Sequence, residues 1–389
     1  MASGRPRRLL TVIESLTRGG GAEQALLHLL PYLRPLGFEV RVAALWGPED
    51  LAPALEASGI RVHALGTSWS ERWHVQTIQP RLRAIAAEYR PDIVHAHLFF
   101  AGVHCALLPD AAAPTRVITF HNMDYDIEPP ITWPRRARKR IHELLVRGRF
   151  DGCVGVSAAV AQHYQHALHL PHVDAIANAL PTDEIAPRSV DRNDVLARFG
   201  VPEGTPVIGM PGRLVKQKGH AVLLDALKIL ESRSLRPSVL ALGGGPLEAE
   251  LRTSIRDRGL SDRVVMHQPL PHDRLMDVLR AVDLVVMPSL HEGFGIVAAE
   301  AMSLAKPLVA SDIPPLREIV DDEVSGLLVT PGDAGALADG IQRILENPGF
   351  GANLAAKARD RVVERFSSAA IASQWATHYE RLLSRSPTS

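Results

Sequence analysis

The sequence MPSLHEGFGIVAAEAM, residues 287–302, joins a short apolar segment to a helical pattern through a glycine-containing loop. Residues 283–288, rich in valine, predict a buried parallel strand, and residues 296–305 predict a helix of good helix formers. Gly293 and Gly295 let the backbone approach a ligand closely, and the start of a helix offers unpaired N–H groups to an anion. The stretch therefore predicts a strand–loop–helix unit that can hold an anion.

Two carboxylates accompany this predicted anion site. Glu292 lies in the loop, and Glu300 lies eight residues later, inside the predicted helix. A carboxylate in an otherwise apolar helix is costly to bury unless it has a partner, and a pair of sugar or ribose hydroxyls would be one. Taken alone, the pair also fits a helix start with an incidental surface glutamate, so the interpretation depends on the rest of the chain.

The alternation of short apolar segments and helical patterns continues on both sides of this stretch. Strands are predicted at residues 9–13, 38–45, 60–63, 92–95, 117–120, 153–156, 205–210, 239–246, 263–267, 307–311 and 326–331. This repeated strand-then-helix order predicts an α/β fold with parallel, doubly wound sheets. The polar residues 187–193 predict a linker, and a chain of 389 residues is long enough for two domains.

Two further loops carry groups that suit a phosphate-bearing ligand. Gly20 and Gly21 lie between a predicted strand and a predicted helix, at the carboxyl end of a sheet where α/β proteins bind ligands. The spacing G-x-G-x-x-G is missing there, so this loop is not the dinucleotide fingerprint. Residues 212–219, GRLVKQKG, place Arg213 and Lys218 after a later strand, and two cations at one strand end suit a diphosphate.

These loops resemble the motifs of one enzyme family. Residues 287–302 resemble the E-x7-E signature of the retaining glycosyltransferases of family 4. Residues 212–219 resemble the family's Gly-Arg-x4-Lys-Gly element, and residues 20–23 resemble its Gly-Gly-x-Glu loop. The resemblance covers nearly the whole chain.

The resemblance implies the GT-B fold, in which two Rossmann-like domains with parallel sheets face each other across a cleft. It implies an acceptor-side domain in residues 1–185 and a nucleotide-sugar donor domain in residues 186–366. A closing helical pattern over residues 366–383 implies that the C-terminal segment 367–389 crosses back to the first domain.

Roles follow from the same resemblance. Arg213 and Lys218 would hold the diphosphate, Glu292 the sugar hydroxyls and Glu300 the ribose hydroxyls. His121 would lie next to the transferred sugar. The other implied donor-site positions are Gly20, Gly21, Gly244, Leu270, Gly293, Phe294, Gly295 and Ile296. The chain departs from the family in two places: residues 178–181 lack the usual Gly and Asp, and Gln268 replaces a common Gly.

A bound metal is not expected. His95 and His97 fall at a strand end and have the residue types of metal ligands, but the family's His-x-His holds no metal. Asp124 and Asp126 have the spacing of a metal-binding Asp-x-Asp pair, yet they follow His121 in a loop without a matching phosphate loop. We therefore expect no cofactor and activity that is independent of metal.

Composition narrows the partners and the compartment. With 43 basic and 43 acidic residues the formal net charge is zero, which argues against an obligatory nucleic-acid partner. Two cysteines, Cys105 and Cys153, without metal-like spacing fit a reducing, cytoplasmic compartment, and no apolar run reaches membrane-spanning length. The basic residues 133–149 suit either peripheral contact with the inner face of a membrane or a solvated helix face.

The expected function is the transfer of a sugar from a UDP- or GDP-linked donor to an acceptor hydroxyl, with retention at the anomeric carbon. The acceptor would be a saccharide or a lipid-linked precursor for the cell envelope, in the synthesis of cell-envelope polysaccharide, glycolipid or glycoconjugate. One alternative is a nucleotide-sugar 2-epimerase of GT-B type, and another is a degenerate, non-catalytic transferase-like subunit. These motifs specify neither the sugar, the base nor the acceptor.

Overall fold

The computed structural model describes residues 5–125, 133–182, 185 and 189–385. The chain divides into two compact units. The first comprises Met1–Leu180 and Ser368–Ser389, and the second comprises Pro181–Ser367. Of the linker predicted at residues 187–193, residues 187 and 188 lie outside the described residues.

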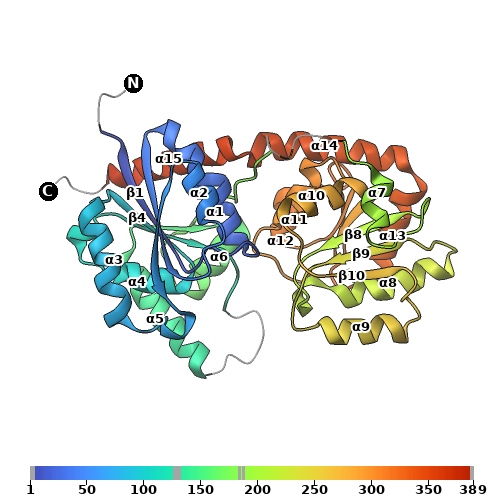
Figure 1. Cartoon of the computed structure of the whole chain (residues 1–389), viewed down its shortest axis with the longest axis horizontal. Coiled ribbons are helices and arrows are strands. Elements are labelled where there is room, and N and C mark those ends of the chain that lie inside the picture. The colour runs from blue at the N-terminus through green and yellow to red at the C-terminus, as the bar shows by residue number, and fades with distance from the viewer. Residues whose placement is uncertain (1–4, 126–132, 183–184, 186–188, 386–389) are drawn as a thin grey trace. The chain divides into compact units, whose positions relative to one another are not determined.

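The first unit is built on a parallel sheet of seven strands in the order β3-β2-β1-β4-β5-β6-β7 (Figure 1). The strands are β1 Arg7–Ile13, β2 Phe38–Trp46, β3 Arg61–Thr67, β4 Ile93–His97, β5 Arg116–Phe120, β6 Gly152–Gly155 and β7 Asp174–Ala175. Every residue of the central strands β4 and β5 is buried, whereas the edge strand β3 is buried only in part. The order reverses beside β1, and the carboxyl ends of β1 and β4 lie next to each other at that point.

Helices cover both faces of this sheet (Figure 1). They are α1 Gly21–Leu33, α2 Ala52–Ala57, α3 Val75–Tyr89, α4 Phe99–Ala106, α5 Trp133–Arg149, α6 Ala158–Ala167 and α15 Ser368–Leu383. Short 3-10 turns occupy η1 Arg34–Leu36, η2 Trp69–Glu71 and η3 Asp110–Ala112. The C-terminal helix α15 packs beside α1, so both ends of the chain contribute to this unit.

The second unit contains a parallel sheet of six strands in the order β10-β9-β8-β11-β12-β13. The strands are β8 Val207–Pro211, β9 Ser238–Leu242, β10 Val264–His267, β11 Leu284–Met287, β12 Leu308–Ser311 and β13 Leu327–Val329. All six are short, and apolar side chains from each of them enter one core with those of the flanking helices. The order reverses between β8 and β11, which places their carboxyl ends side by side.

The helices of the second unit also lie on both faces of its sheet (Figure 1). They are α7 Arg192–Ala197, α8 His220–Ser232, α9 Glu248–Asp257, α10 His272–Ala281, α11 Ile296–Ser303, α12 Pro314–Ile319, α13 Ala334–Glu346 and α14 Pro348–Phe366, with the 3-10 turn η4 Lys216–Lys218. Helix α8 packs against α13 on one face, and α10 packs against α7 on the other. The α/β class with two parallel sheets is therefore confirmed.

The closing helix begins later than the sequence pattern indicates. Phe366 ends α14, where its ring packs edge-to-face on Phe294 of the second unit. Ser367 is extended, with ψ of 148°, and α15 starts at Ser368. The Ser368 N–H and hydroxyl both donate to the carbonyl of Leu180, at 2.9 Å each, and so fix the start of α15 in the first unit.

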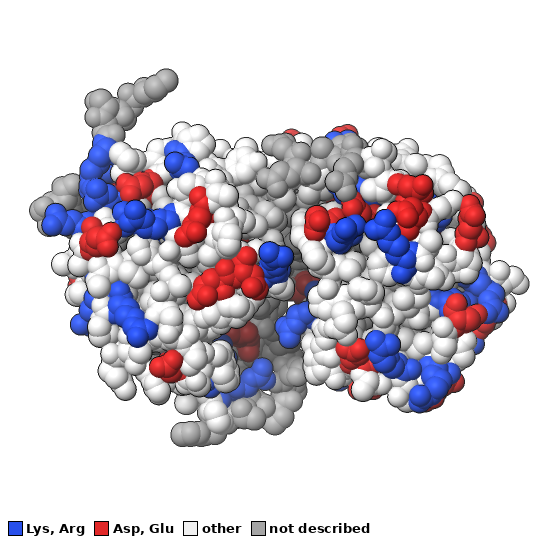
Figure 2. All heavy atoms as spheres, in the orientation of Figure 1, with Lys and Arg blue, Asp and Glu red and all other residues white. Residues whose placement is uncertain are grey.

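Acidic and basic residues are equal in number in the chain. Figure 2 shows acidic and basic side chains interspersed on the face that it presents. This mixture agrees with the balanced composition of the chain. Among the described residues, no helix combines the length and the apolar character needed to cross a membrane.

Candidate functional site

Two loops at neighbouring strand ends of the second unit are locked together. One follows β8 and contains η4, and the other joins β11 to α11. The Leu290 N–H donates to the Gln217 carbonyl at 2.7 Å. Gly219 has φ of 71°, and a Cβ there would lie 1.9 Å from the Pro288 carbonyl oxygen. Only glycine fits this approach, and it holds Lys218 against the loop that carries Glu292.

Lys218 and Glu292 are in direct contact. The Lys218 Nζ donates to Glu292 Oε1 at 2.6 Å, and the Ser289 hydroxyl donates to the same oxygen at 2.8 Å. The Glu292 side chain is only 8% exposed, so the ammonium group is the partner that makes its burial tolerable. The structure thus joins the residue expected at the diphosphate to the residue expected at the sugar hydroxyls.

The start of α11 lies in the same loop as Glu292. Gly295 precedes the helix with φ of 109°, and a Cβ there would meet Leu316 Cδ2 at 2.6 Å. Among the described residues no side chain caps this helix, so the N–H groups of its first turn, which begins at Ile296, have no side-chain partner. Phe294 turns its ring into the unit, which leaves its backbone rather than its side chain for a ligand.

Glu300 lies in the second turn of α11 and is buried. Its Oε1 accepts a hydrogen bond from His272 Nε2 at 2.9 Å. His272 is the first residue of α10 and was not among the residues predicted from the sequence. The available signal was its position just after strand β10, at the ligand-binding edge of the sheet and two residues beyond Leu270.

The other predicted donor-site residues come from adjacent loops. Arg213 follows β8 with an exposed side chain that makes no hydrogen bond or ion pair to any residue the structure describes. The Leu214 N–H donates to the Gly244 carbonyl at 3.0 Å, which joins the loop after β8 to the loop after β9. A Cβ at Gly244 would lie 3.4 Å from Pro269, beside the half-buried Leu270.

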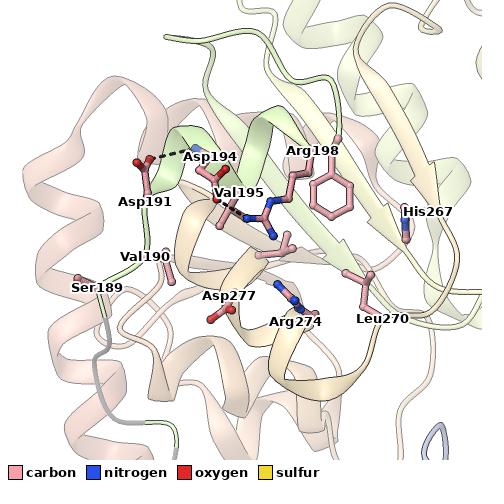
Figure 3. Close-up of a pocket in the computed structure, with 12 residues that line it drawn as sticks. Ser189, Val190, Asp191, Asp194, Val195, Arg198, His267, Leu270, Arg274 and Asp277 are labelled. Carbon is pink, nitrogen blue, oxygen red and sulfur yellow. Dashed lines mark hydrogen bonds and ion pairs between the residues drawn. The ribbon is translucent and has the colours of Figure 1, made fainter.

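A cavity of about 470 Å³ opens between α7 and α10 (Figure 3). Its lining consists of Ser189, Val190, Asp191, Asp194, Val195, Arg198, Phe199, His267, Leu270, Arg274, Asp277 and Val278. Leu270 is the one predicted site residue in this lining; Lys218, Glu292 and Glu300 lie outside it. The cavity is therefore not the site defined by the carboxylates.

In the first unit, Gly20 and Gly21 lie where the sequence predicts, at the start of α1. A Cβ at Gly20 would fall 1.9 Å from Glu23 Oε2, because this carboxylate folds back over the helix start. The hydroxyls of Ser15 and Thr17 donate to Glu23 Oε1 at 3.3 Å and 3.4 Å. Burial raises the pKa of Glu23, and the two hydroxyl contacts lower it in part.

His121 forms a pair with His97. His97 Nδ1 lies 3.0 Å from His121 Nε2, so one ring donates to the other. Burial lowers the pKa of His121 to about 3, and both rings are neutral. His97 Nε2 and His121 Nδ1 are buried and have no hydrogen-bond partner among the described residues.

His95 has a structural position instead. Its Nδ1 lies 2.7 Å from the Tyr379 hydroxyl and its Nε2 lies 2.7 Å from the Thr119 hydroxyl. The ring therefore connects β4 to β5 and to α15. Within the described parts of the chain, no group of three or more His, Cys, Asp or Glu side chains could hold a metal ion, and Asp126 lies outside those parts.

Glu14 is a further titratable group, half-buried, that the sequence did not single out. It follows β1, and its Oε1 accepts the Phe100 N–H at 2.8 Å. Burial raises its pKa to about 7. It lies at the carboxyl end of the first sheet, where α/β proteins bind ligands.

The basic helix α5 uses part of its charge within the first unit. Arg138 pairs with Asp124 at 3.0 Å, and Arg149 donates to the carbonyls of Ala106 and Leu108. Ile141 and Leu144 are exposed on the same helix, at 42% and 58%.

Solved structures place this architecture in a known class. The chain superposes with TM-score 0.80 on HepE of Anabaena in complex with UDP-glucose, at 23% identity over 96% of this chain and 99% of that one. It superposes with TM-score 0.81 on sucrose-phosphate synthase of Thermosynechococcus elongatus, at 23% identity over 97% and 100%. The fold is that of the GT-B glycosyltransferases.

Sequence comparisons define the family. The model described as Glycosyltransferase Family 4 matches residues 19–184, and that described as Glycosyl transferases group 1 matches residues 191–361. A D-inositol 3-phosphate glycosyltransferase of Xylanimonas cellulosilytica is 33% identical over 295 residues, 72% of this chain and 69% of that protein. A 2-deoxystreptamine glucosyltransferase of Streptomyces kanamyceticus is 33% identical over 216 residues. This match spans 55% of this chain and 55% of that protein. The chain belongs to the family 4 glycosyltransferases, the glycosyl transferases group 1, and is a glycosyltransferase.

Proposed function

We propose that this protein transfers a sugar from a nucleoside-diphosphate sugar to an acceptor hydroxyl, with retention of configuration at the anomeric carbon. The observation that carries the proposal is the contact of Lys218 with Glu292 beside the uncapped start of α11. This arrangement provides a cation and helix N–H groups for phosphate oxygens, and a carboxylate for hydroxyl groups.

The donor would displace the contact between Lys218 and Glu292. Diphosphate oxygens accept hydrogen bonds from Lys218 and Arg213, and the dipole of α11 favours the same negative charge. Once Lys218 turns to the phosphate, Glu292 is available to accept hydrogen bonds from the sugar hydroxyls. Glu300 would accept from the ribose hydroxyls.

The chemical step follows from stabilising the leaving group. The bond from the anomeric carbon to the phosphate oxygen breaks, and the acceptor oxygen bonds to that carbon from the same face. The acceptor proton passes to the departing phosphate. Arg213, Lys218 and the α11 N–H groups stabilise the charge that develops on the diphosphate, so a metal is not required.

UDP-sugars are the first donors to test, because HepE was solved with UDP-glucose. GDP-sugars are the second choice. For the acceptor we propose a saccharide or a lipid-linked saccharide. The names of two relatives add two cyclitols to the panel of acceptors to test: inositol phosphate and 2-deoxystreptamine. We place the reaction in the cytoplasm, because both cysteines are free thiols.

The deciding experiment is incubation with a panel of sugar nucleotides, with and without acceptors, read by mass spectrometry. Transfer predicts release of the nucleoside diphosphate together with a product heavier than the acceptor by one glycosyl residue. Its anomeric configuration, read by NMR, should match that of the donor. An epimerised sugar formed without acceptor would indicate the 2-epimerase, and absence of reaction with every pair would indicate a non-catalytic subunit.

A further inference from the structure

The contact between His272 and Glu300 connects two different strand-end elements. His272 is the first residue of α10, after β10, and Glu300 lies inside α11, after β11. The side chain of His272 is 34% exposed, whereas that of Glu300 is 6% exposed. The imidazole therefore reaches inward from the surface to a carboxylate that is nearly enclosed.

This hydrogen bond fixes the proton position and the orientation of both groups. A carboxylate only accepts hydrogen bonds, so His272 Nε2 must carry the proton at 2.9 Å from Glu300 Oε1. Among the described residues, His272 is the only hydrogen-bond partner of the Glu300 side chain. Each carboxylate oxygen has two acceptor sites, so Oε2 and one site on Oε1 remain for a ligand.

Free acceptor sites on both oxygens of one fixed carboxylate match two adjacent hydroxyl groups. A vicinal diol can donate one hydrogen bond to each oxygen of a carboxylate whose plane is held still. Without His272 the carboxylate would lose the partner that fixes its plane, and it would adopt other orientations, including ones turned toward water. The bound diol would then lose part of the geometry on which its hydrogen bonds depend.

We propose that His272 is a positioning residue that orients Glu300 for the two hydroxyls of the donor's ribose. It thereby sets the preference of the site for ribonucleotides over 2′-deoxyribonucleotides. This inference rests on the proposed function, because it takes the ligand of Glu300 to be the ribose. His272 acts through Glu300 and does not touch the reacting atoms.

The test is calorimetric titration with UDP and with 2′-deoxy-UDP, or with the guanosine pair if the wild-type protein binds GDP more tightly. The variants are His272→Leu, which removes the donor, and His272→Gln, whose amide nitrogen restores it. Asp273→Ala, at the next and exposed position of α10, controls for disturbance of the helix start. Thermal unfolding of each variant reports whether it folds, and His272→Ala, which also lacks the donor, replaces His272→Leu if the latter does not fold.

In the wild type, UDP should bind about tenfold more tightly than 2′-deoxy-UDP, because one hydrogen bond to a carboxylate is lost. In His272→Leu, the affinity for UDP should fall by about three- to tenfold, whereas the affinity for 2′-deoxy-UDP should fall less. The preference for UDP should therefore shrink. His272→Gln should recover most of the preference, and Asp273→Ala should behave as the wild type.

Two failures are distinguishable. Equal binding of UDP and 2′-deoxy-UDP by the wild type would refute the ribose assignment of Glu300 in the proposed function. A preference in the wild type that survives unchanged in a folded His272→Leu would overturn the role of His272 alone. An equal loss of affinity for UDP and for 2′-deoxy-UDP would likewise show that His272 has only a structural role.

Discussion

At the residue scale, the site is a set of charges that satisfy one another. Lys218 and Glu292 are separated by 74 positions, yet their side chains meet at 2.6 Å. The sequence motifs name both residues, but no spacing in the sequence predicts that they touch. The contact implies that donor binding exchanges one ion pair for another, so the two residues are energetically coupled.

Replacing Glu292 by glutamine should reduce turnover while the fold survives. The amide oxygen can still accept from Lys218 and Ser289, but the charge-assisted bonds to sugar hydroxyls are lost, each worth about 1.5–3 kcal/mol. The expected decrease in kcat is about tenfold to a hundredfold. Glu346→Gln, an exposed change on α13, is the control for steady-state kinetics and melting. An unchanged kcat in Glu292→Gln would remove Glu292 from the site.

At the element scale, the sequence patterns locate most strands and helices of both sheets to within a few residues. The short strand β7 was missed, because two residues carry no alternation that could be recognised. The start of the last helix was misplaced, because Phe366 belongs to α14 through its contact with Phe294. His272 was missed for a similar reason: its meeting with Glu300 depends on how α10 and α11 lie in space.

The glycine between η4 and α8 should be the most sensitive backbone position of the site. Gly219 and Gly200 have nearly equal φ values, 71° and 69°, but a Cβ at Gly219 would meet the Pro288 carbonyl, whereas Gly200 has nothing within 4 Å. Gly200→Ala should lower the free energy of unfolding only by the conformational strain of a left-handed alanine, about 1–2 kcal/mol. Gly219→Ala should cost distinctly more in urea unfolding and should also reduce turnover, because Lys218 is displaced. Equal losses in both variants would contradict the account of this loop.

We propose that helix α5 makes peripheral contact with anionic membrane through its exposed Ile141 and Leu144. Such a surface gains from buried apolar area and from arginines near lipid phosphates. Leu144→Glu should weaken cosedimentation with vesicles containing phosphatidylglycerol, and Val363→Glu, an exposed change on α14, should not. If the wild-type protein does not sediment with these vesicles, α5 is a solvated helix face.

At the scale of the whole molecule, we expect buried histidines to make the first unit sensitive to acid. Burial lowers the pKa of His95, His97, His121 and His142 in the first unit. Below about pH 6.5 the unfolded chain takes up protons at these rings while the folded unit does not, so unfolding is favoured. Each of these rings should lower the free energy of unfolding by about 1.4 kcal/mol at pH 5.5.

Stability of the first unit should therefore fall between pH 7.5 and pH 5.5. Glu14 opposes this trend, because its raised pKa, about 7, lets the folded unit take up a proton first as the pH falls. Glu14→Gln removes that compensation, so its loss of stability should be larger than that of the wild type. Hydrogen exchange of peptides from β4 and β5 measures the effect. Constant protection over this range would show that these rings do not control the stability of the unit.

The central claim is that Arg213, Lys218 and the start of α11 stabilise a diphosphate leaving group without a metal. The most direct measurement is the rate of nucleoside diphosphate release from the preferred sugar nucleotide in excess EDTA. The wild type should remain active, and Arg213→Ala and Lys218→Ala should each lose on the order of 10²–10³ in turnover. Lys228→Ala, an exposed lysine on α8, should match the wild type. Complete loss of wild-type activity in EDTA, restored by Mg²⁺ or Mn²⁺, would contradict the account and return Asp124 and Asp126 to the catalytic candidates.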